Sequence, residues 1–157
     1  MYNTAEDLLD ALQSTPDTLQ ELLSPVTNDQ AAKARGGDEN WSVIEILCHL
    51  RDVEERAIER MRQMRDEQDP KIPAFDQEKW AVERNYAKAD LKQPLERFLD
   101  FRATHIRELS CLRPEDWERI GEHEEQRRIT ISAHTLHIVS HDAVHLAQIA
   151  RQLGSTK

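Results

Sequence analysis

The amino-acid sequence predicts an all-α protein, and three observations support this fold class. Hydrophobic residues make up 38% and charged residues 32% of the 157 positions, a balance that suits long amphipathic helices. Only four glycines and six prolines interrupt the chain. Over long stretches the apolar residues recur at steps of three and four, which places them on one face of a helix. Because a chain of this length can bury a core without disulfides or metal, we expect residues 1–157 to form a single domain.

The first expected element is a helical arm that bends at a proline. Residues 4–14 and 16–23 each place leucines on one side of a helix. Between them, Thr15 suits an N-cap and Pro16 suits the first position of a helix. We therefore predict an N-terminal helix that is kinked at Pro16. Residues 24–40, which contain few apolar side chains, are predicted to form a long connection.

A second long helix is predicted to begin at Ser42, and it carries the first candidate ligand. Ser42 and Glu45 match the capping-box pattern that starts many helices. The apolar residues that follow at helical spacing are Val43, Ile46, Leu50, Val53, Ala57, Met61 and Met64. His49 lies at the edge of this buried stripe. A histidine there is either a hydrogen-bonded core residue or a metal ligand.

The middle of the chain is predicted to contain two further helices and two loops. Residues 68–75 hold two prolines and should form a loop. A short extra helix is expected near residues 76–89, and a longer one from Asp90, a candidate N-cap, to Ser110. Residues 113–129 are mostly polar and are predicted to be a loop.

The last predicted helix, residues 130–153, carries four of the seven histidines. His141 and His145 stand four residues apart, so their imidazoles lie one above the other on the same face. His134 falls on the same line as these two histidines and His137 lies further round the helix; both are predicted to lie at the surface or at the rim of a site.

Three histidines, His49, His141 and His145, form a candidate metal site. Neutral imidazoles suit zinc, nickel or iron, and three protein ligands leave positions open for water or substrate. The segment HDAVH carries aspartate where zinc proteases of the H-E-x-x-H type have their catalytic glutamate, which excludes that class. A di-iron bundle is excluded as well, because the last helix contains no glutamate.

Two aspartates are candidates for orienting these ligands or for moving protons. Asp52 lies about one turn after His49, although the simpler interpretation is an ordinary solvated helix residue. Asp142 falls on the buried stripe of the last helix, where a carboxylate is costly unless it is paired. It either bonds to His49 or to an arginine, or it reaches water at the edge of the helix.

Composition also excludes several classes of partner. The net charge of −9 argues against nucleic acid, because phosphate binding needs a basic surface. No 18-residue apolar run predicts a membrane-spanning helix, and the acidic first thirty residues lack the pattern of a signal peptide. Cys48 and Cys111 are too few for a disulfide framework. We therefore expect reduced thiols and a cytoplasmic protein.

The segments WSVIEILCHLRDVEE, AFDQEKWAVERNY and TISAHTLHIVSHDAVHLAQIARQL together resemble the DinB/YfiT superfamily of metal-dependent proteins, in its DinB_2-like branch. The similarity covers nearly the whole chain. It implies a four-helix bundle with long crossing connections, and a zinc or nickel ion bound by His49, His141 and His145. It also implies a homodimer. Characterised members of the superfamily include S-transferases that use low-molecular-weight thiols.

These observations leave two functional hypotheses. In the first, the protein is a metal-dependent enzyme, either a thiol S-transferase or a hydrolase, that acts on a low-molecular-weight thiol or an electrophile. A metal ion would generate the nucleophile by deprotonating a bound thiol or water. In the second, the bundle is a non-catalytic metal-binding or stress-related interaction protein that acts as a dimer.

Overall fold

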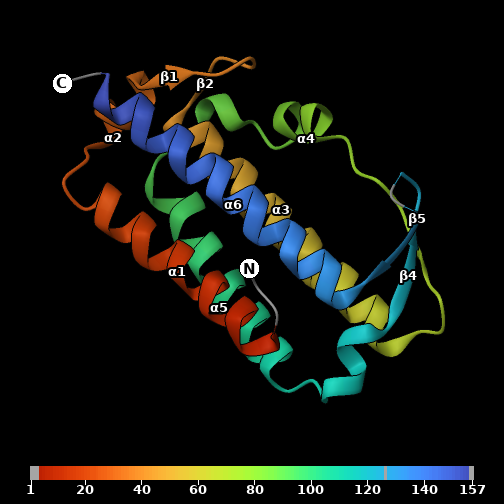
Figure 1. Cartoon of the computed structure of the whole chain (residues 1–157). Helices are drawn as coiled ribbons and strands as arrows, with labels where there is room; N and C mark the ends of the chain where they lie inside the picture. Colours follow the sequence, from red (N-terminus) through yellow and green to blue (C-terminus); the bar gives the residue numbers. More distant parts are fainter. Residues whose placement is uncertain (1–3, 126, 156–157) are drawn as a thin grey trace.

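Four long helices form the centre of the computed structural model, which describes residues 4–125 and 127–155 (Figure 1). They are α1 (Ala5–Leu23), α3 (Val43–Asp66), α5 (Lys92–Ser110) and α6 (Ile131–Gly154). Helix α3 packs against α5 and α6, and α1 packs against the same two helices. Helices α1 and α3 therefore lie at opposite corners of a bundle, and the predicted four-helix bundle is confirmed.

The contacts between α3 and α5 show that these two helices run parallel. Arg51, early in α3, bonds to Gln93 at the start of α5, whereas Arg62 bonds to Glu108 near the end of α5. A chain that leaves the end of α3 must therefore return along the bundle before α5 can begin. Residues 67–91 make this long crossing connection.

Short elements occupy the connections between the long helices. The first connection contains α2 (Asn28–Lys33), β1 (Arg35–Gly36) and β2 (Trp41–Ser42). The second contains β3 (Lys71–Ile72), α4 (Gln77–Glu83) and the 3-10 helix η1 (Tyr86–Lys88). The third contains the 3-10 helix η2 (Pro114–Glu118), β4 (Ile120–His123) and β5 (Arg127–Thr130). Strands β1 and β2 pair antiparallel, while β4 pairs with β3 in parallel and with β5 in antiparallel fashion.

Several sequence-based expectations change in these connections. The segment 113–129 is not a loop, because it holds η2 and most of a β-hairpin whose strands are too short and too polar to show an alternating pattern. The connection at 24–40 contains a helix. The extra helix near 76–89 is present as α4, which ends where Asn85 takes a left-handed conformation with φ of 60°, before η1 follows.

Helix α1 passes through Pro16 without a break, so Thr15 does not cap a second helix. Proline has no N–H to donate to the carbonyl four residues earlier, which is that of Leu12. A guanidinium N–H of the buried Arg102 donates to this Leu12 carbonyl at 2.9 Å instead. The Thr15 hydroxyl is buried and donates to Asp142 at 2.8 Å. The Arg102 bond thus replaces the one that Pro16 cannot make, and the proline is accommodated inside the helix.

The predicted starts of the two ligand-bearing helices are observed. Ser42 accepts from the backbone N–H of Glu45 at 3.2 Å, and the Glu45 carboxylate accepts from the Ser42 N–H at 2.7 Å, which completes the capping box of α3. Thr130 caps α6 by accepting from Ala133 N–H at 3.0 Å. These caps fix where each helix begins, and the apolar stripe of each helix determines which side chains face the bundle interior.

A polar layer divides the hydrophobic core into two clusters. One cluster surrounds the first half of α3 and includes Leu19, Leu47 and Phe98, and the other surrounds its second half and includes Leu12 and Met61. The layer between them consists of the buried residues Thr15, Glu54, Arg102, His105 and Asp142. Among the described residues, no helix is long and apolar enough to cross a bilayer.

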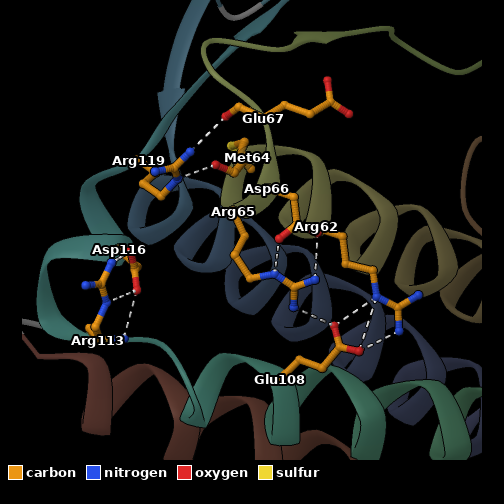
Figure 2. A network of polar contacts seen from close by, with 9 residues as sticks. All are labelled: Arg62, Met64, Arg65, Asp66, Glu67, Glu108, Arg113, Asp116 and Arg119. Atoms are coloured by element: carbon orange, nitrogen blue, oxygen red, sulfur yellow. Dashed lines mark hydrogen bonds and ion pairs between the residues drawn. The ribbon is translucent and has the colours of Figure 1, made fainter.

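Ion pairs join the ends of α3 and α5, as Figure 2 shows. The Glu108 carboxylate accepts from both Arg62 and Arg65 of α3. Beyond them, Arg119 donates to the carbonyls of Met64 and Glu67 at 2.8 and 2.9 Å. Arg119 directly precedes β4, so these two bonds fix the start of the hairpin against the end of α3.

Candidate metal centre

Helices α3 and α6 bring the three predicted ligands together. His49 lies in the second turn of α3, and His141 and His145 lie on successive turns in the middle of α6. Ring nitrogens of all three lie within 4.8 Å of one another, and the Nε2 atoms of His49 and His141 are 2.9 Å apart. The ring centroids are separated by 4.5 to 5.0 Å. The three side chains form one cluster, while the binding of a metal to them stays a prediction.

Burial keeps these three rings uncharged at neutral pH. Burial, together with the nearby His145, lowers the pKa of His49 to about 4. Burial likewise lowers the pKa of His141 to about 2, with contributions from His145 and His49, and it lowers the pKa of His145. Imidazole binds metal only in its neutral form. The cluster therefore offers neutral nitrogen ligands over the whole physiological pH range.

A chain of two glutamines fixes the orientation of His145. Its Nδ1 lies 3.0 Å from the Gln148 side-chain carbonyl, which can only accept, so Nδ1 carries the proton. The Gln148 amide donates to Gln152 at 3.0 Å, and Gln152 donates to the backbone carbonyls of Ala34 and Trp41. Because Nδ1 is the donor, the lone pair of His145 is on Nε2 and is free to bind a ligand.

The arrangement of His49 and His141 fits a shared cation. Their Nε2 atoms face each other, and two neutral rings in this position repel unless one of them carries the proton there. A cation held between the two Nε2 lone pairs would remove this repulsion. The donor set of three imidazoles also suits zinc and nickel. The residues present therefore fit the metal that the sequence predicts.

Asp52 is fully buried, so it is not the solvated helix residue that the sequence left open. Its carboxylate accepts from Arg51 Nε at 2.8 Å, from Arg84 Nη1 at 2.7 Å and from the Tyr86 hydroxyl. Burial raises the pKa of Tyr86, and its bond to Asp52 raises it further. Among the hydrogen bonds of the described residues, none joins Asp52 to a ligand imidazole. Its role in proton transfer stays a prediction.

Asp142 pairs with an arginine, one of the alternatives that the sequence left open. It accepts from Arg102 at 2.8 and 3.2 Å and from Thr15 at 2.8 Å. Arg102 also binds Glu54 through two bonds of 2.9 Å, and His105 Nδ1 lies 2.7 Å from the same carboxylate. Since Asp142 directly follows His141, this buried cluster holds the ligand-bearing turn of α6 against the other three helices.

A cavity of about 260 Å³ opens beside the histidine cluster. It lies between α3, α6, the hairpin β4–β5 and the crossing connection. Its lining consists of His49, Val53, Arg60, Ala74, Phe75, Gln77, His123, Glu125, His137, Ile138 and His141. Two of the three candidate ligands thus face a space that a small molecule can enter.

The sequence misplaced one histidine and did not identify two residues that line the cavity. His134 is buried, with 3% of its surface exposed, and not at the surface as predicted. It precedes Ile138 and Asp142 at steps of four, so it belongs to the buried line of α6. Arg60 follows His49 by eleven residues, a spacing that returns to the same helix face and could have revealed it. His123 lies on a strand that the sequence did not predict.

Comparison with known proteins settles the family. The DinB superfamily, in its DinB_2 form, matches residues 11–149. This chain belongs to the DinB superfamily. Its resemblance to that group, which rested on the segments around His49 and His141 and on AFDQEKWAVERNY between them, is confirmed. As a DinB-superfamily protein it places the three histidines on the second and last long helices of the bundle.

Two curated relatives and one solved structure extend this comparison. The DinB-superfamily chain is 25% identical to a protein of Oceanobacillus iheyensis over 160 residues, and the aligned region covers 97% of this chain and 88% of that protein. It is 29% identical over 146 residues to a second protein of the same organism, and this alignment covers 90% of this chain and 81% of that protein. Both are named "Putative metal-dependent hydrolase".

The fold is similar to that of YfiT from Bacillus subtilis. The two structures superpose with a TM-score of 0.87 at 20% identity, over 99% of this chain and 89% of YfiT. YfiT is described as "a probable metal-dependent hydrolase with an unusual four-helix bundle topology". At this level of identity the likeness shows the fold, and it supports the parallel pairing and crossing connection seen here.

Proposed function

We propose that this DinB-superfamily protein is a metal-dependent hydrolase that binds one divalent ion through His49, His141 and His145. The observation that carries the proposal is the set of three neutral imidazoles whose ring nitrogens lie within 4.8 Å of one another. A cavity lined by two of these rings gives a substrate access to them. The names of the two Oceanobacillus relatives support the same class of reaction.

Zinc or nickel is the ion that we expect at this site, because both accept imidazole nitrogen. Three protein ligands leave at least one coordination position free, which is typical of catalytic rather than structural sites. The bound ion would supply a Lewis acid and an activated water at neutral pH.

The chain's own residues have three tasks in this proposal. Gln148 holds the proton on His145 Nδ1 and so keeps Nε2 available. Val53, Phe75 and Ile138 give the cavity apolar walls that limit the entry of bulk water. Asp142 has its oxygens bonded to Arg102 and Thr15, so we assign it the positioning of α6.

Metal analysis tests the site directly. Protein purified without a nickel column should contain about one equivalent of divalent metal per chain, the stoichiometry of a single site. His49→Ala, His141→Ala and His145→Ala should each lose most of it. His137→Ala is the matched control, since this exposed histidine lies one turn before His141 and outside the cluster. Full metal content in all three cluster variants would refute the assignment.

A second experiment separates the reactions open to such a site. A panel of small esters and amides should be hydrolysed by the metal-loaded protein and not by His49→Ala. Consumption of a low-molecular-weight thiol in the presence of an electrophile, lost in the same variant, would instead identify an S-transferase. Inactivity in both assays with metal bound would favour the non-catalytic binding protein. Sedimentation velocity would test the proposed homodimer.

A further inference from the structure

The cavity beside the histidine cluster has a guanidinium at its other end. Arg60 follows His49 by eleven residues in α3, and at ~100° per residue the two lie on the same helix face, roughly 20° apart. Both side chains line the same cavity. Arg60 is the only arginine or lysine among the described residues that line it.

The donors of Arg60 are largely unused. Its Nη2 donates to the Pro73 carbonyl at 3.0 Å, and its guanidinium stands 5.6 Å from the centre of the Phe75 ring. Its Nε is buried and has no hydrogen-bond partner. Between described residues, Arg60 forms no ion pair. Arg102, by contrast, uses all five of its N–H groups on acceptors inside the bundle.

An arginine in this state favours the binding of an anion. A buried N–H without an acceptor is unfavourable. Burial and the nearby Arg56 lower the pKa of Arg60, and they outweigh Glu125 and Glu59, which act in the opposite direction. A carboxylate in the cavity could accept from guanidinium N–H groups of Arg60 that have no acceptor within the protein, since guanidinium and carboxylate can form two bonds together. Phe75 beside the guanidinium limits its hydration and would strengthen that pair.

The charges around the cavity favour a monoanion. Burial lowers the pKa of His123, and the nearby Arg60 lowers it further, so that this ring is neutral at neutral pH. The carboxylate of Glu125 lines the same cavity and repels anions, so a ligand with a single negative charge paired to Arg60 is favoured over one with two. At about 260 Å³, the cavity is also smaller than the pockets that enclose drug-sized ligands.

We propose that this cavity selects a small substrate that carries one carboxylate, with the carboxylate paired to Arg60 and the scissile ester or amide at the end formed by His49 and His141. The position of the scissile bond rests on the proposed function. The carboxylate subsite rests on Arg60 and its surroundings. The two can therefore be tested apart.

Binding to metal-free protein tests the subsite without any contribution from a metal ion. Benzoate, its neutral isostere benzamide, and inorganic phosphate are titrated into the full chain, and the Arg Nε–H signals are followed by 15N NMR. We expect benzoate to shift the Arg60 signal in a saturable manner. Benzamide should bind at least about tenfold more weakly, because it lacks the charge-assisted bonds. Phosphate should also bind more weakly than benzoate.

Matched variants assign the effect to Arg60. Arg60→Gln should weaken benzoate binding about tenfold or more. Arg56→Gln should leave it unchanged, because Arg56 lies one turn earlier, stands 5.8 Å from the Trp80 ring and does not line the cavity. Arg60→Lys, which keeps the charge without the planar fork, should give an intermediate Kd. This variant also answers the question if Arg60→Gln fails to fold.

The outcomes separate this proposal from the metal site. Metal content of Arg60→Gln should equal that of the wild-type protein, whereas the histidine variants lose metal. Benzoate binding by a chain that holds no metal even after zinc is added would support the subsite and refute the proposed function. Four results would overturn the carboxylate subsite: no benzoate binding, equal binding of benzamide, tighter binding of phosphate, or unchanged binding by Arg60→Gln.

Discussion

Replacement of Arg102 by methionine should remove much of the stability of the bundle. Arg102 is 1% exposed and donates to Glu54, Asp142 and the Leu12 carbonyl. Breaking a buried ion pair by removing one partner costs ~3–5 kcal/mol. The Leu12 carbonyl, which Pro16 leaves without its helical donor, adds ~1–3 kcal/mol when unsatisfied. A loss of about 4 kcal/mol or more compares with ~5–15 kcal/mol for the total stability of a typical domain.

Urea unfolding followed by far-UV circular dichroism measures this loss, and Glu54 shows its origin. Although burial by itself raises the pKa of the Glu54 carboxyl, Arg102 and His105 outweigh it and hold the pKa below its ordinary value of 4.5. The contribution of Glu54 is therefore complete above pH 4.5 and is lost as the pH falls from there toward the lowered value. At neutral pH, Glu54→Gln should destabilise the wild-type protein.

The same Glu54→Gln change should stabilise the Arg102→Met variant, because there it removes a buried charge that has lost its arginine partner and keeps only His105. This reversal of sign is the specific signature of the buried pair. Arg62→Met serves as the control, since Arg62 also binds a carboxylate but its side chain is 45% exposed. We expect a much smaller effect from it. The reasoning fails if Arg102→Met and Arg62→Met lower stability equally, or if Glu54→Gln acts in the same direction in both backgrounds.

Three further predictions follow from the packing around the site. Gly121→Ala should lower the free energy of unfolding by ~1–3 kcal/mol, because a Cβ there would lie 2.9 Å from side chains of β3 and α3. Gly154→Ala is the control, because a Cβ at Gly154 would have no atom within 4 Å. An equal loss of stability in both variants would contradict this reasoning. Burial, aided by the nearby His105, lowers the pKa of His134 from 6.5 to about 3, so wild-type stability should fall as the pH drops below 6.5, since only the unfolded ring takes up a proton. Urea titrations across that range should show a flatter profile for His134→Leu, and an unchanged profile would exclude His134 as the cause. Gln148→Leu should weaken zinc binding ~10–100-fold in competition with a chromogenic chelator, and unchanged affinity would show that the orientation of His145 does not depend on it.

Much of the helical architecture could be predicted because its signals are local. The capping box of Ser42 and Glu45, and the periodic apolar residues after it, specify α3 without reference to the rest of the chain. The spacing of His141 and His145 likewise determines that they share a face of α6. That His49 reaches the same point depends on helix packing, which the family resemblance supplied and periodicity alone did not.

The remaining features depend on contacts between distant segments. The strands β3, β4 and β5 have two to four residues each, so they exist only because they pair with one another. Pro16 predicts an interruption of α1, because the Leu12 carbonyl loses its helical donor. The donor that replaces it belongs to Arg102, 86 positions after Pro16 in the sequence. The sequence does not distinguish Arg60 from the other charged residues of α3, because its environment depends on Phe75 in the crossing connection.

The parallel course of α3 and α5 has a consequence for how this protein could diversify. It forces residues 67–91 to travel back along the bundle, and part of this crossing, with Ala74, Phe75 and Gln77, forms one wall of the cavity. None of these three side chains belongs to either hydrophobic cluster. Connecting segments of this kind tolerate insertions and substitutions better than the helices they join. A library confined to residues 73–77 could thus alter the size and charge of the accepted ligand while the bundle, its polar layer and its histidines stay unchanged.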